Sequence, residues 1–258
     1  MSLTTTLQTV IHDVSKFETL LPVILTGLEH NVKCFKAGNL TSFLSEWRSI
    51  TSDREILGMI MGTTIDFRYL PVQHGPPAIR EFSDTESTII KTEIEKLLNK
   101  GVIVRTDRET DDFISPIFLR EKKDGSYRMI LNLKVLNKSI VYHHFKMDTL
   151  SSVIKLIRPN CFMATIDLKD AYYSVPVSEK HQKYLKFHWK GNFYKFTCFP
   201  NGLCFCPRKF TKLIKPVHSC LRLQGHTLAA YIDDNYIQGD TYTECLTTVL
   251  EINIETVS

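Results

Sequence analysis

Two short stretches of this chain decide its fold: Thr165-Ile-Asp-Leu-Lys-Asp-Ala-Tyr-Tyr173 and Tyr231-Ile-Asp-Asp234. In the first, Asp167 follows an apolar run whose length and composition are typical of a buried strand. In the second, Asp233 and Asp234 lie between two strand-like runs, which predicts a hairpin. If the two strands pair, the three carboxylates meet at one edge of a sheet.

Three carboxylates close together repel one another, and their charge is costly unless cations neutralise it. Carboxylate oxygens are hard ligands, of the kind that Mg²⁺ and Mn²⁺ prefer. Two such ions about 4 Å apart would activate an attacking hydroxyl and stabilise a leaving phosphate. The alternative is ordinary turn chemistry, since aspartate is common in hairpin loops that have no catalytic role.

Further motifs follow in order along the chain. Segment 115–137 contains the tight-turn signal Lys123-Asp-Gly-Ser126, which predicts a two-stranded hairpin. Phe199-Pro-Asn-Gly-Leu203 precedes a helix that starts at Pro207. Together with the two carboxylate stretches, these segments resemble the fingers and palm of reverse transcriptases, in which Tyr-x-Asp-Asp is the polymerase signature. The resemblance runs from about residue 76 to about residue 240.

The resemblance implies an α+β fold: the fingers and palm of a right-hand polymerase, with an antiparallel palm sheet packed on helices. The mixture of helical and strand-like segments favours the same class. We expect a helical N-terminal extension over residues 1–75 and the fingers and palm over residues 76–258. The family's thumb and RNase H segments have no counterpart in the sequence, so we expect the thumb to be absent and the grip on a duplex to be weak.

A narrower resemblance is to the DIRS-type branch of retrotransposons. It is carried by segment 38–53, by Pro200-Asn-Gly-Leu203 with Pro207-Arg208, and by segment 210–217. Membership of that branch would imply a longer polyprotein that also contains RNase H and a tyrosine recombinase.

Within the reverse transcriptase resemblance, Asp167 and Asp233 are the main metal ligands and Asp234 completes the acidic cluster. The backbone carbonyl of Leu168 is a further ligand. The implied cofactor is a pair of Mg²⁺ ions, with Mn²⁺ as an alternative.

The resemblance also assigns residues to the incoming nucleotide. Lys122 and Arg128 match the triphosphate-binding cations, and Tyr172 matches the aromatic steric gate that selects deoxynucleotides. Asp170 and Ala171 lead into a helix whose first N–H groups would suit phosphate. A solvated basic turn and a core aromatic are the simpler alternatives for the cations and for Tyr172.

Two assignments are weaker. Asn201, before Gly202, stands where the retroviral pattern has a glutamine, so the template and sugar contacts of that glutamine do not transfer directly. Tyr231 would lie beside the primer end, although an ordinary strand aromatic explains it nearly as well.

Charge indicates a nucleic-acid partner. The whole chain carries a net charge of only +4, but residues 178–222 contain ten Lys or Arg and one acidic residue. Aromatic residues are interleaved with these cations, as in proteins that bind phosphate backbones. We expect an RNA or DNA template with its primer, and deoxynucleoside triphosphates, as partners; a solvated basic face is the alternative.

Cysteine usage and hydropathy bear on the compartment. Seven cysteines without a Cys-x-x-Cys motif argue against a disulfide framework, and the spacing of Cys198, Cys204, Cys206, His218 and Cys220 fits no common zinc pattern. The apolar run Val23-Ile-Leu25 is too short to cross a membrane. We therefore expect no membrane association and an intracellular protein, cytoplasmic or nuclear.

Local signals predict several elements. Ser83 and Glu86 form a capping-box pattern at the start of a helix that Gly101 ends. Runs 102–104 and 113–114 are strand-like, and 241–251 is helical. The helix from Pro207 should bury Phe210, Leu213, Ile214 and Val217 and bend at Pro216.

These observations favour an RNA-directed DNA polymerase domain of a retrotransposon, in which a primer 3′-hydroxyl attacks the α-phosphorus of a deoxynucleotide. A truncated, inactive remnant that still binds nucleic acid is the first alternative. An RNA-dependent RNA polymerase and a metal-dependent hydrolase are the others, and both leave part of the motif set unexplained.

Overall fold

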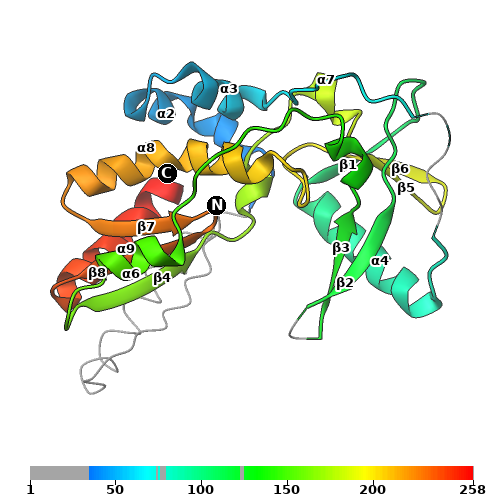
Figure 1. Ribbon diagram of the computed structural model, residues 1–258. Coiled ribbons are helices and arrows are strands. Elements are labelled where there is room, and N and C mark those ends of the chain that lie inside the picture. Colours follow the sequence, from blue (N-terminus) through cyan, green and yellow to red (C-terminus); the bar gives the residue numbers. More distant parts are fainter. Residues whose placement is uncertain (1–34, 74, 76–79, 123–124, 258) are drawn as a thin grey trace. The chain divides into compact units, whose positions relative to one another are not determined.

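The computed structural model describes residues 35–73, 75, 80–122 and 125–257. These residues form two compact units, each described here by itself (Figure 1). The hairpin unit contains residues 36–144 and 172–210, and the carboxylate unit contains residues 145–171 and 211–257. Of the expected extension over residues 1–75, residues 35–73 and 75 are described and contain three short helices, whereas residues 1–34 and 74 lie outside the described residues.

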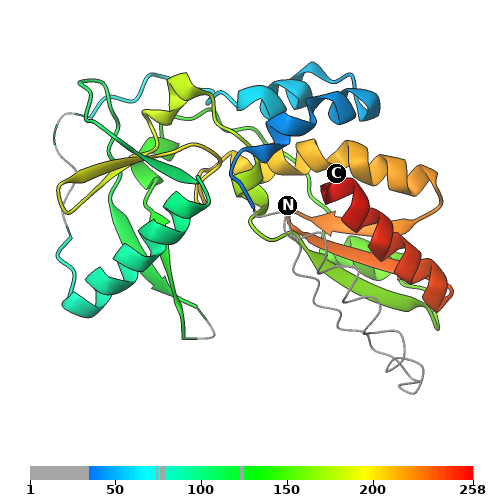
Figure 2. The ribbon, with the colours of Figure 1, turned by 180° about the vertical axis from the view of Figure 1, so that it is seen from behind.

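The carboxylate unit is built on a three-stranded antiparallel sheet in the order β4-β8-β7. Its strands are β4 (Phe162–Asp167), β7 (Thr227–Tyr231) and β8 (Asp234–Gly239). Helix α9 (Tyr242–Val257) packs against β4 and β8, and it lies in front of the sheet in Figure 2 and behind it in Figure 1. Helix α6 (Leu150–Leu156) packs against β7. Helix α8 (Cys206–Leu223) belongs to the carboxylate unit from Thr211 onward.

One face of this sheet is buried and the other is exposed at the end that carries the aspartates. On β4, Ala164 and Ile166 are buried, whereas Thr165 and Asp167 are exposed. The predicted strand before Asp167 is confirmed, but it is buried on one face only, because Thr165 is exposed. The strand alternates because helices cover only one face of the sheet at this point.

Gly239 ends β8 at a point where only glycine fits. A Cβ atom there would lie 2.5 Å from the backbone nitrogen of Cys245 and 2.9 Å from the Cβ of Glu244. The first turn of α9 is held by reciprocal bonds: the Thr241 hydroxyl accepts from the Glu244 N–H, and the Glu244 carboxylate accepts from the Thr241 N–H, both at 3.2 Å. Strand β8 and helix α9 can therefore pack this closely only because Gly239 has no side chain.

Replacing Gly239 by alanine should lower the free energy of unfolding by about 1–3 kcal/mol, because the new methyl group must push α9 away from β8. Gly58→Ala is a matched control: Gly58 lies inside α3 (Arg54–Gly62), where an added Cβ atom would meet nothing within 4 Å, and the substitution should gain about 0.5–1 kcal/mol. Urea denaturation measures both. Equal stability of Gly239→Ala and the wild type would contradict the packing argument.

The hairpin unit contains two small antiparallel sheets. Strands β2 (Ile117–Glu121) and β3 (Tyr127–Leu131) form the predicted hairpin. The second sheet has the order β1-β6-β5, from β1 (Ile103–Thr106), β5 (Lys186–Trp189) and β6 (Asn192–Phe196). The predicted strand at 113–114 is wrong, because Ile114 makes only an isolated bridge to Lys186.

Helices complete the hairpin unit, and their local signals are confirmed. Helix α4 (Asp84–Asn99) begins with the Ser83–Glu86 capping box, and Gly101 follows its end with a φ of 69°. The shorter helices are η2 (Asn39–Phe43), α2 (Leu44–Ile50), α3, α5 (Lys134–Asn137) and α7 (Glu179–Gln182). The four residues predicted for the buried face of α8 are buried, and α8 continues past Pro216 to Leu223.

None of the helices in the described part of the chain combines the length and the apolarity that crossing a lipid bilayer requires.

Candidate active site

The register of the sheet brings the candidate carboxylates together. Asp167, the last residue of β4, is the cross-strand partner of Asp234, the first residue of β8. Directly opposed residues of antiparallel strands point to the same face, with Cβ atoms about 5 Å apart. Both aspartates are exposed, and Asp233 precedes Asp234 in the loop from β7. The predicted convergence of the three residues at one sheet edge is confirmed.

A backbone hydrogen bond ties the two aspartate segments to each other. The N–H of Leu168 donates to the carbonyl of Asp233 at 3.0 Å. The carbonyl of Leu168 accepts from the N–H of Ala171 at 3.2 Å, which leaves its second lone pair for another partner. The ligand role expected of that carbonyl stays a prediction.

The electrostatics of the cluster favour a cation. Although the side chain is exposed, desolvation by neighbouring protein atoms, and secondly the charge of Asp234, raise the pKa of Asp167 above its ordinary value of 3.8. The ionised form of Asp167 is thus disfavoured by its surroundings, and a bound dication would reverse that preference. A donor set made of carboxylate oxygens suits Mg²⁺ or Mn²⁺.

The loop that carries Asp233 is strained. Tyr231 and Asp234 are cross-strand partners, so only Ile232 and Asp233 connect β7 to β8. Ile232 has a φ of 60°, a conformation rare for β-branched residues and one that costs about 1–3 kcal/mol. Two-residue hairpin loops require positive φ at their first position, where glycine or asparagine is usual. The sequence predicts the hairpin but not this strain.

Asp167→Asn should raise the melting temperature at pH 7 in the absence of divalent cations, because it removes a charge that the folded state disfavours. A raised carboxyl pKa means that stability falls as the pH rises through the carboxyl range. The difference between variant and wild type should therefore shrink as the pH is lowered toward 4.

Adding Mg²⁺ should stabilise the wild type more than Asp167→Asn. Differential scanning fluorimetry between pH 4 and pH 8, with and without Mg²⁺, measures both effects. A variant that is less stable than the wild type at pH 7 without metal would refute the electrostatic account.

The hairpin unit holds the predicted triphosphate cations on adjoining strands. Arg128 lies on β3, and Lys122 follows β2, with its N–H bonded to the Ser126 carbonyl at 2.7 Å. Arg120 is the cross-strand partner of Arg128 and lies two residues from Lys122, so alternation places all three cations on one face. All three are exposed. Sequence reasoning missed Arg120, although its i, i+2 spacing from Lys122 in a strand was a usable signal.

The expected helix at Asp170 is shorter than predicted. Ala171–Ser174 form one 3₁₀ turn, η3, preceded by Asp170 in a left-handed conformation with a φ of 58°. The N–H of Ala171 is bonded to the Leu168 carbonyl, so it is not available to phosphate as a helix terminus would offer it. The helix is thus a single turn, and the phosphate-binding role expected of this segment stays a prediction.

Tyr172 is half-buried and packs edge-on against Phe210, with ring centroids 5.5 Å apart. This contact fixes the plane of the tyrosine ring. Tyr231, the candidate primer-side residue, is 50% exposed at the end of β7.

The loop with Asn201 and Gly202 is anchored by hydrogen bonds within the hairpin unit. The Asn201 side-chain amide donates to the Tyr173 hydroxyl at 3.2 Å, and the Gly202 carbonyl accepts from the Asn137 amide at 2.9 Å. Asn137 also accepts from the Cys204 N–H at 3.0 Å. Asn137, which sequence reasoning did not single out, therefore fixes the shape of this loop.

The predicted basic track is partly structural. Lys186 and Lys209 are buried, and five of the ten cations form ion pairs with acidic residues elsewhere in their own units: Lys183 with Asp111, Lys186 with Asp112, Arg208 and Lys209 with Glu55, and Arg222 with Asp148. These five lysines and arginines therefore have a structural role, and the nucleic-acid role of segment 178–222 stays a prediction.

A second acidic group, Glu109 with Asp111 and Asp112, has ligand oxygens within 4.8 Å of one another. Its charge is already compensated, because Asp112 forms a buried ion pair of 2.7 Å with Lys186 and Asp111 pairs with Lys183. The hydrogen bond with Lys183 lowers the pKa of Asp111. This group is better explained as structural than as a cation site.

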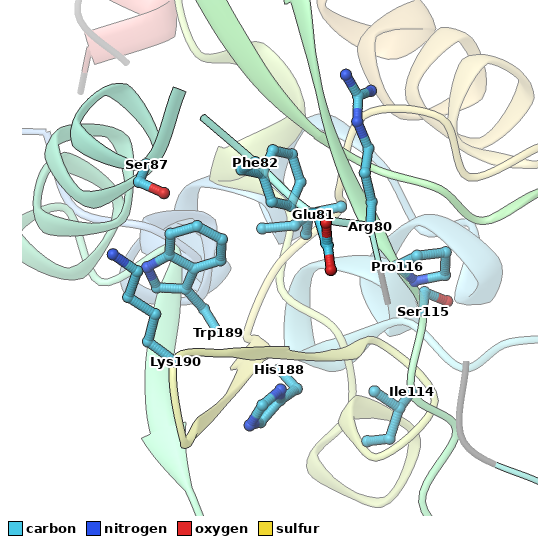
Figure 3. Close-up of a pocket in the computed structure, with 11 residues that line it drawn as sticks. Arg80, Glu81, Phe82, Ser87, Ile114, Ser115, Pro116, His188, Trp189 and Lys190 are labelled. Atoms are coloured by element: carbon cyan, nitrogen blue, oxygen red, sulfur yellow. The ribbon is translucent and has the colours of Figure 1, made fainter. Parts of the chain in front are cut away.

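The hairpin unit also has a cavity of about 490 Å³, lined by aromatic, basic and polar side chains (Figure 3). Phe82 and Trp189 meet edge-on at 5.4 Å, and the Lys190 ammonium lies 5.4 Å from the Trp189 ring centre. None of the candidate catalytic or nucleotide-binding residues lines this cavity.

Comparison with known proteins agrees with the resemblance to reverse transcriptases. The family described as "Reverse transcriptase (RNA-dependent DNA polymerase)" matches residues 120–257. The Pro-Pol polyprotein of Simian foamy virus type 1 is 26% identical over 161 residues, covering 61% of this chain and 13% of the relative. The Gag-Pol polyprotein of Walleye dermal sarcoma virus is 27% identical over 166 residues, covering 61% and 9%. The chain thus spans a small part of the length of these relatives.

Solved structures show the same fold. The structure described as the foamy viral protease-reverse transcriptase in complex with dsDNA has a TM-score of 0.60 and 23% identity. The match covers 76% of the present chain and 39% of the foamy viral chain. A second foamy viral complex, with ds DNA, has a TM-score of 0.56. The fold is the α+β fingers and palm of a polymerase. The chain belongs to the reverse transcriptase family.

Proposed function

We propose that this chain is the RNA-directed DNA polymerase domain of a retrotransposon, which joins deoxynucleotides to the 3′-hydroxyl of a primer. The single observation that carries the proposal is the β4–β8 register, which sets Asp167 opposite Asp234 with Asp233 beside it. Phosphoryl transfer requires little covalent chemistry from the protein and depends on positioning and charge stabilisation.

The carboxylates of Asp167, Asp233 and Asp234 and the carbonyl of Leu168 would hold two Mg²⁺ ions, with Mn²⁺ as a substitute. The ions would supply charge neutralisation at the attacking and leaving oxygens. The protein's own part is to fix the ligands: strand pairing sets Asp167 against Asp234, and the Leu168–Asp233 backbone bond holds the loop.

Lys122 and Arg128 would bind the triphosphate, and we add Arg120 to this set. Arg120 and Arg128 are directly opposed, and like charges in such a pair are destabilising unless an anion lies between them. The planar guanidinium groups suit phosphate oxygens, while Lys122 acts as a mobile point charge.

Tyr172 would exclude ribonucleotides by occupying the space of a 2′-hydroxyl, and its edge-on contact with Phe210 keeps the ring in place. Asp170, Ala171, Asn201 and Gly202 would line the nucleotide, and Tyr231 would contact the primer end.

The partners would be an RNA or DNA template with its primer. The foamy viral neighbours are described in complex with double-stranded DNA, and the viral relatives are polyproteins, which supports a longer protein that also supplies a thumb and RNase H. Within it, residues 1–75 would be a helical extension and residues 76–258 the fingers and palm. We place the element in the DIRS-type branch, with activity in the cytoplasm or nucleus.

Asp167→Asn and Asp233→Asn should each lower extension of a labelled DNA primer on an RNA template at least about a hundredfold, because each removes a ligand charge. Asp240→Asn is the control: Asp240 follows the other end of β8 and forms an exposed ion pair with Arg158, so its loss should leave extension nearly unchanged.

Extension that survives both ligand substitutions would refute the proposal. A wild type that binds primer–template in a salt-dependent manner without extending it would identify an inactive nucleic-acid-binding remnant.

Tyr172→Val should raise the use of ribonucleotides relative to deoxynucleotides by about tenfold or more, since a smaller side chain admits the 2′-hydroxyl. Single-nucleotide incorporation of CTP and dCTP gives the ratio of kcat/KM. Tyr142→Val, at an exposed tyrosine of the same unit, is the control and should leave the ratio unchanged. An unchanged ratio in Tyr172→Val would remove the steric-gate assignment.

A further inference from the structure

Asn235 is a buried polar residue on the central strand of the carboxylate unit, directly after Asp234. It is 1% exposed. Asparagine is disfavoured inside strands, and a buried amide is costly unless hydrogen bonds satisfy it. The contacts of this side chain must therefore explain its presence.

The side chain of Asn235 faces away from the candidate carboxylates. Its cross-strand partners are Ile166 on β4 and Ala230 on β7. Because side chains alternate along a strand, Asn235 lies on the helix-covered face with Ile166, while Asp234 and Asp167 lie on the exposed face. Asn235 cannot act on substrate itself, and any effect on the site must pass through the backbone.

The Asn235 amide joins the two segments that carry the aspartates. Its Nδ2 atom donates to the carbonyl of Ile166 at 3.4 Å and to the carbonyl of Asp233 at 3.2 Å. Ile166 immediately precedes Asp167, and the Asp233 carbonyl also accepts the Leu168 N–H. One side chain thus bridges the backbone on both sides of the aspartate cluster.

His218 on α8 is the polar neighbour of this amide. His218 is 6% exposed; burial, and secondly Arg222, lower its pKa to about 4, while its interaction with the Asn235 side chain and the charge of Asp148 raise it. The imidazole is therefore neutral at pH 7 and has one N–H to donate. Within the described residues, Oδ1 of Asn235 has no hydrogen-bond partner.

We propose that Asn235 is a positioning residue: its amide fixes the separation of the Asp167 and Asp233 backbones. The consequence for catalysis rests on the proposed polymerase function, whereas the effect on the backbone and on the metal ligands does not. Removal of a group that orients metal ligands without contacting the metal typically lowers metal affinity or activity by about 10–100-fold.

The test compares Asn235→Leu with Gln238→Met. Gln238 is a matched control, because it is a second buried amide on β8, 2% exposed, farther from the aspartates. Hydrogen exchange of the Leu168 amide reports the bond to Asp233, and titration with Mn²⁺ alone reports the ligands. In Asn235→Leu we expect exchange about tenfold faster and Mn²⁺ binding about tenfold weaker, with both near wild type in the control.

Leu168 exchange and Mn²⁺ affinity that match the wild type in Asn235→Leu would overturn the proposal. If Asn235→Leu does not fold, Asn235→Ser retains a smaller donor and is judged by the same two measurements. In primer extension, kcat should fall while the KM for deoxynucleotide stays constant. If the wild type does not extend primers, the polymerase proposal fails, but the exchange and Mn²⁺ results still decide the role of Asn235.

Discussion

The pairing of β4 with β8 is the interaction on which the rest of the structure depends. It joins two strands that are far apart in sequence, and its register alone decides that Asp167 faces Asp234. A shift of one residue would turn one of the two side chains to the helix-covered face. The burial of Ile166 and Ile237 holds the register, because such a slip would expose one of the two side chains.

Several features of the candidate active site lower the stability of the folded protein. Like charges are opposed at the sheet edge, the environment of Asp167 disfavours its ionised form, and Ile232 is held in a left-handed conformation. Each of these terms costs free energy in the protein alone. These unfavourable features persist because the surrounding structure is rigid. Helix α9 packs closely on Gly239 and against the apolar face of the sheet.

Features fixed by neighbours in sequence could be predicted: the Ser83–Glu86 cap, the β2–β3 hairpin and the buried stripe of α8 all follow from spacing. Features that depend on distant partners could not. The sequence did not show which cations of the basic segment are paired, because their acidic partners, such as Asp112, lie far away in the chain. For the same reason nothing in the sequence marked Asn235, whose amide binds the carbonyl of Ile166 on β4 and that of Asp233 in the β7–β8 loop.

The central position of β8 also affects how the chain is made. β4 has no strand partner among the described residues except β8, so its edge stays unpaired while everything from Leu168 to Asp233 is synthesised. During this interval a nascent chain exposes an apolar strand edge, the kind of surface that invites pairing with other chains. Emergence of β8 pairs one edge of β4 and assembles the acidic cluster in the same step. The aspartates therefore cannot come together on the ribosome before the sheet that holds them is complete.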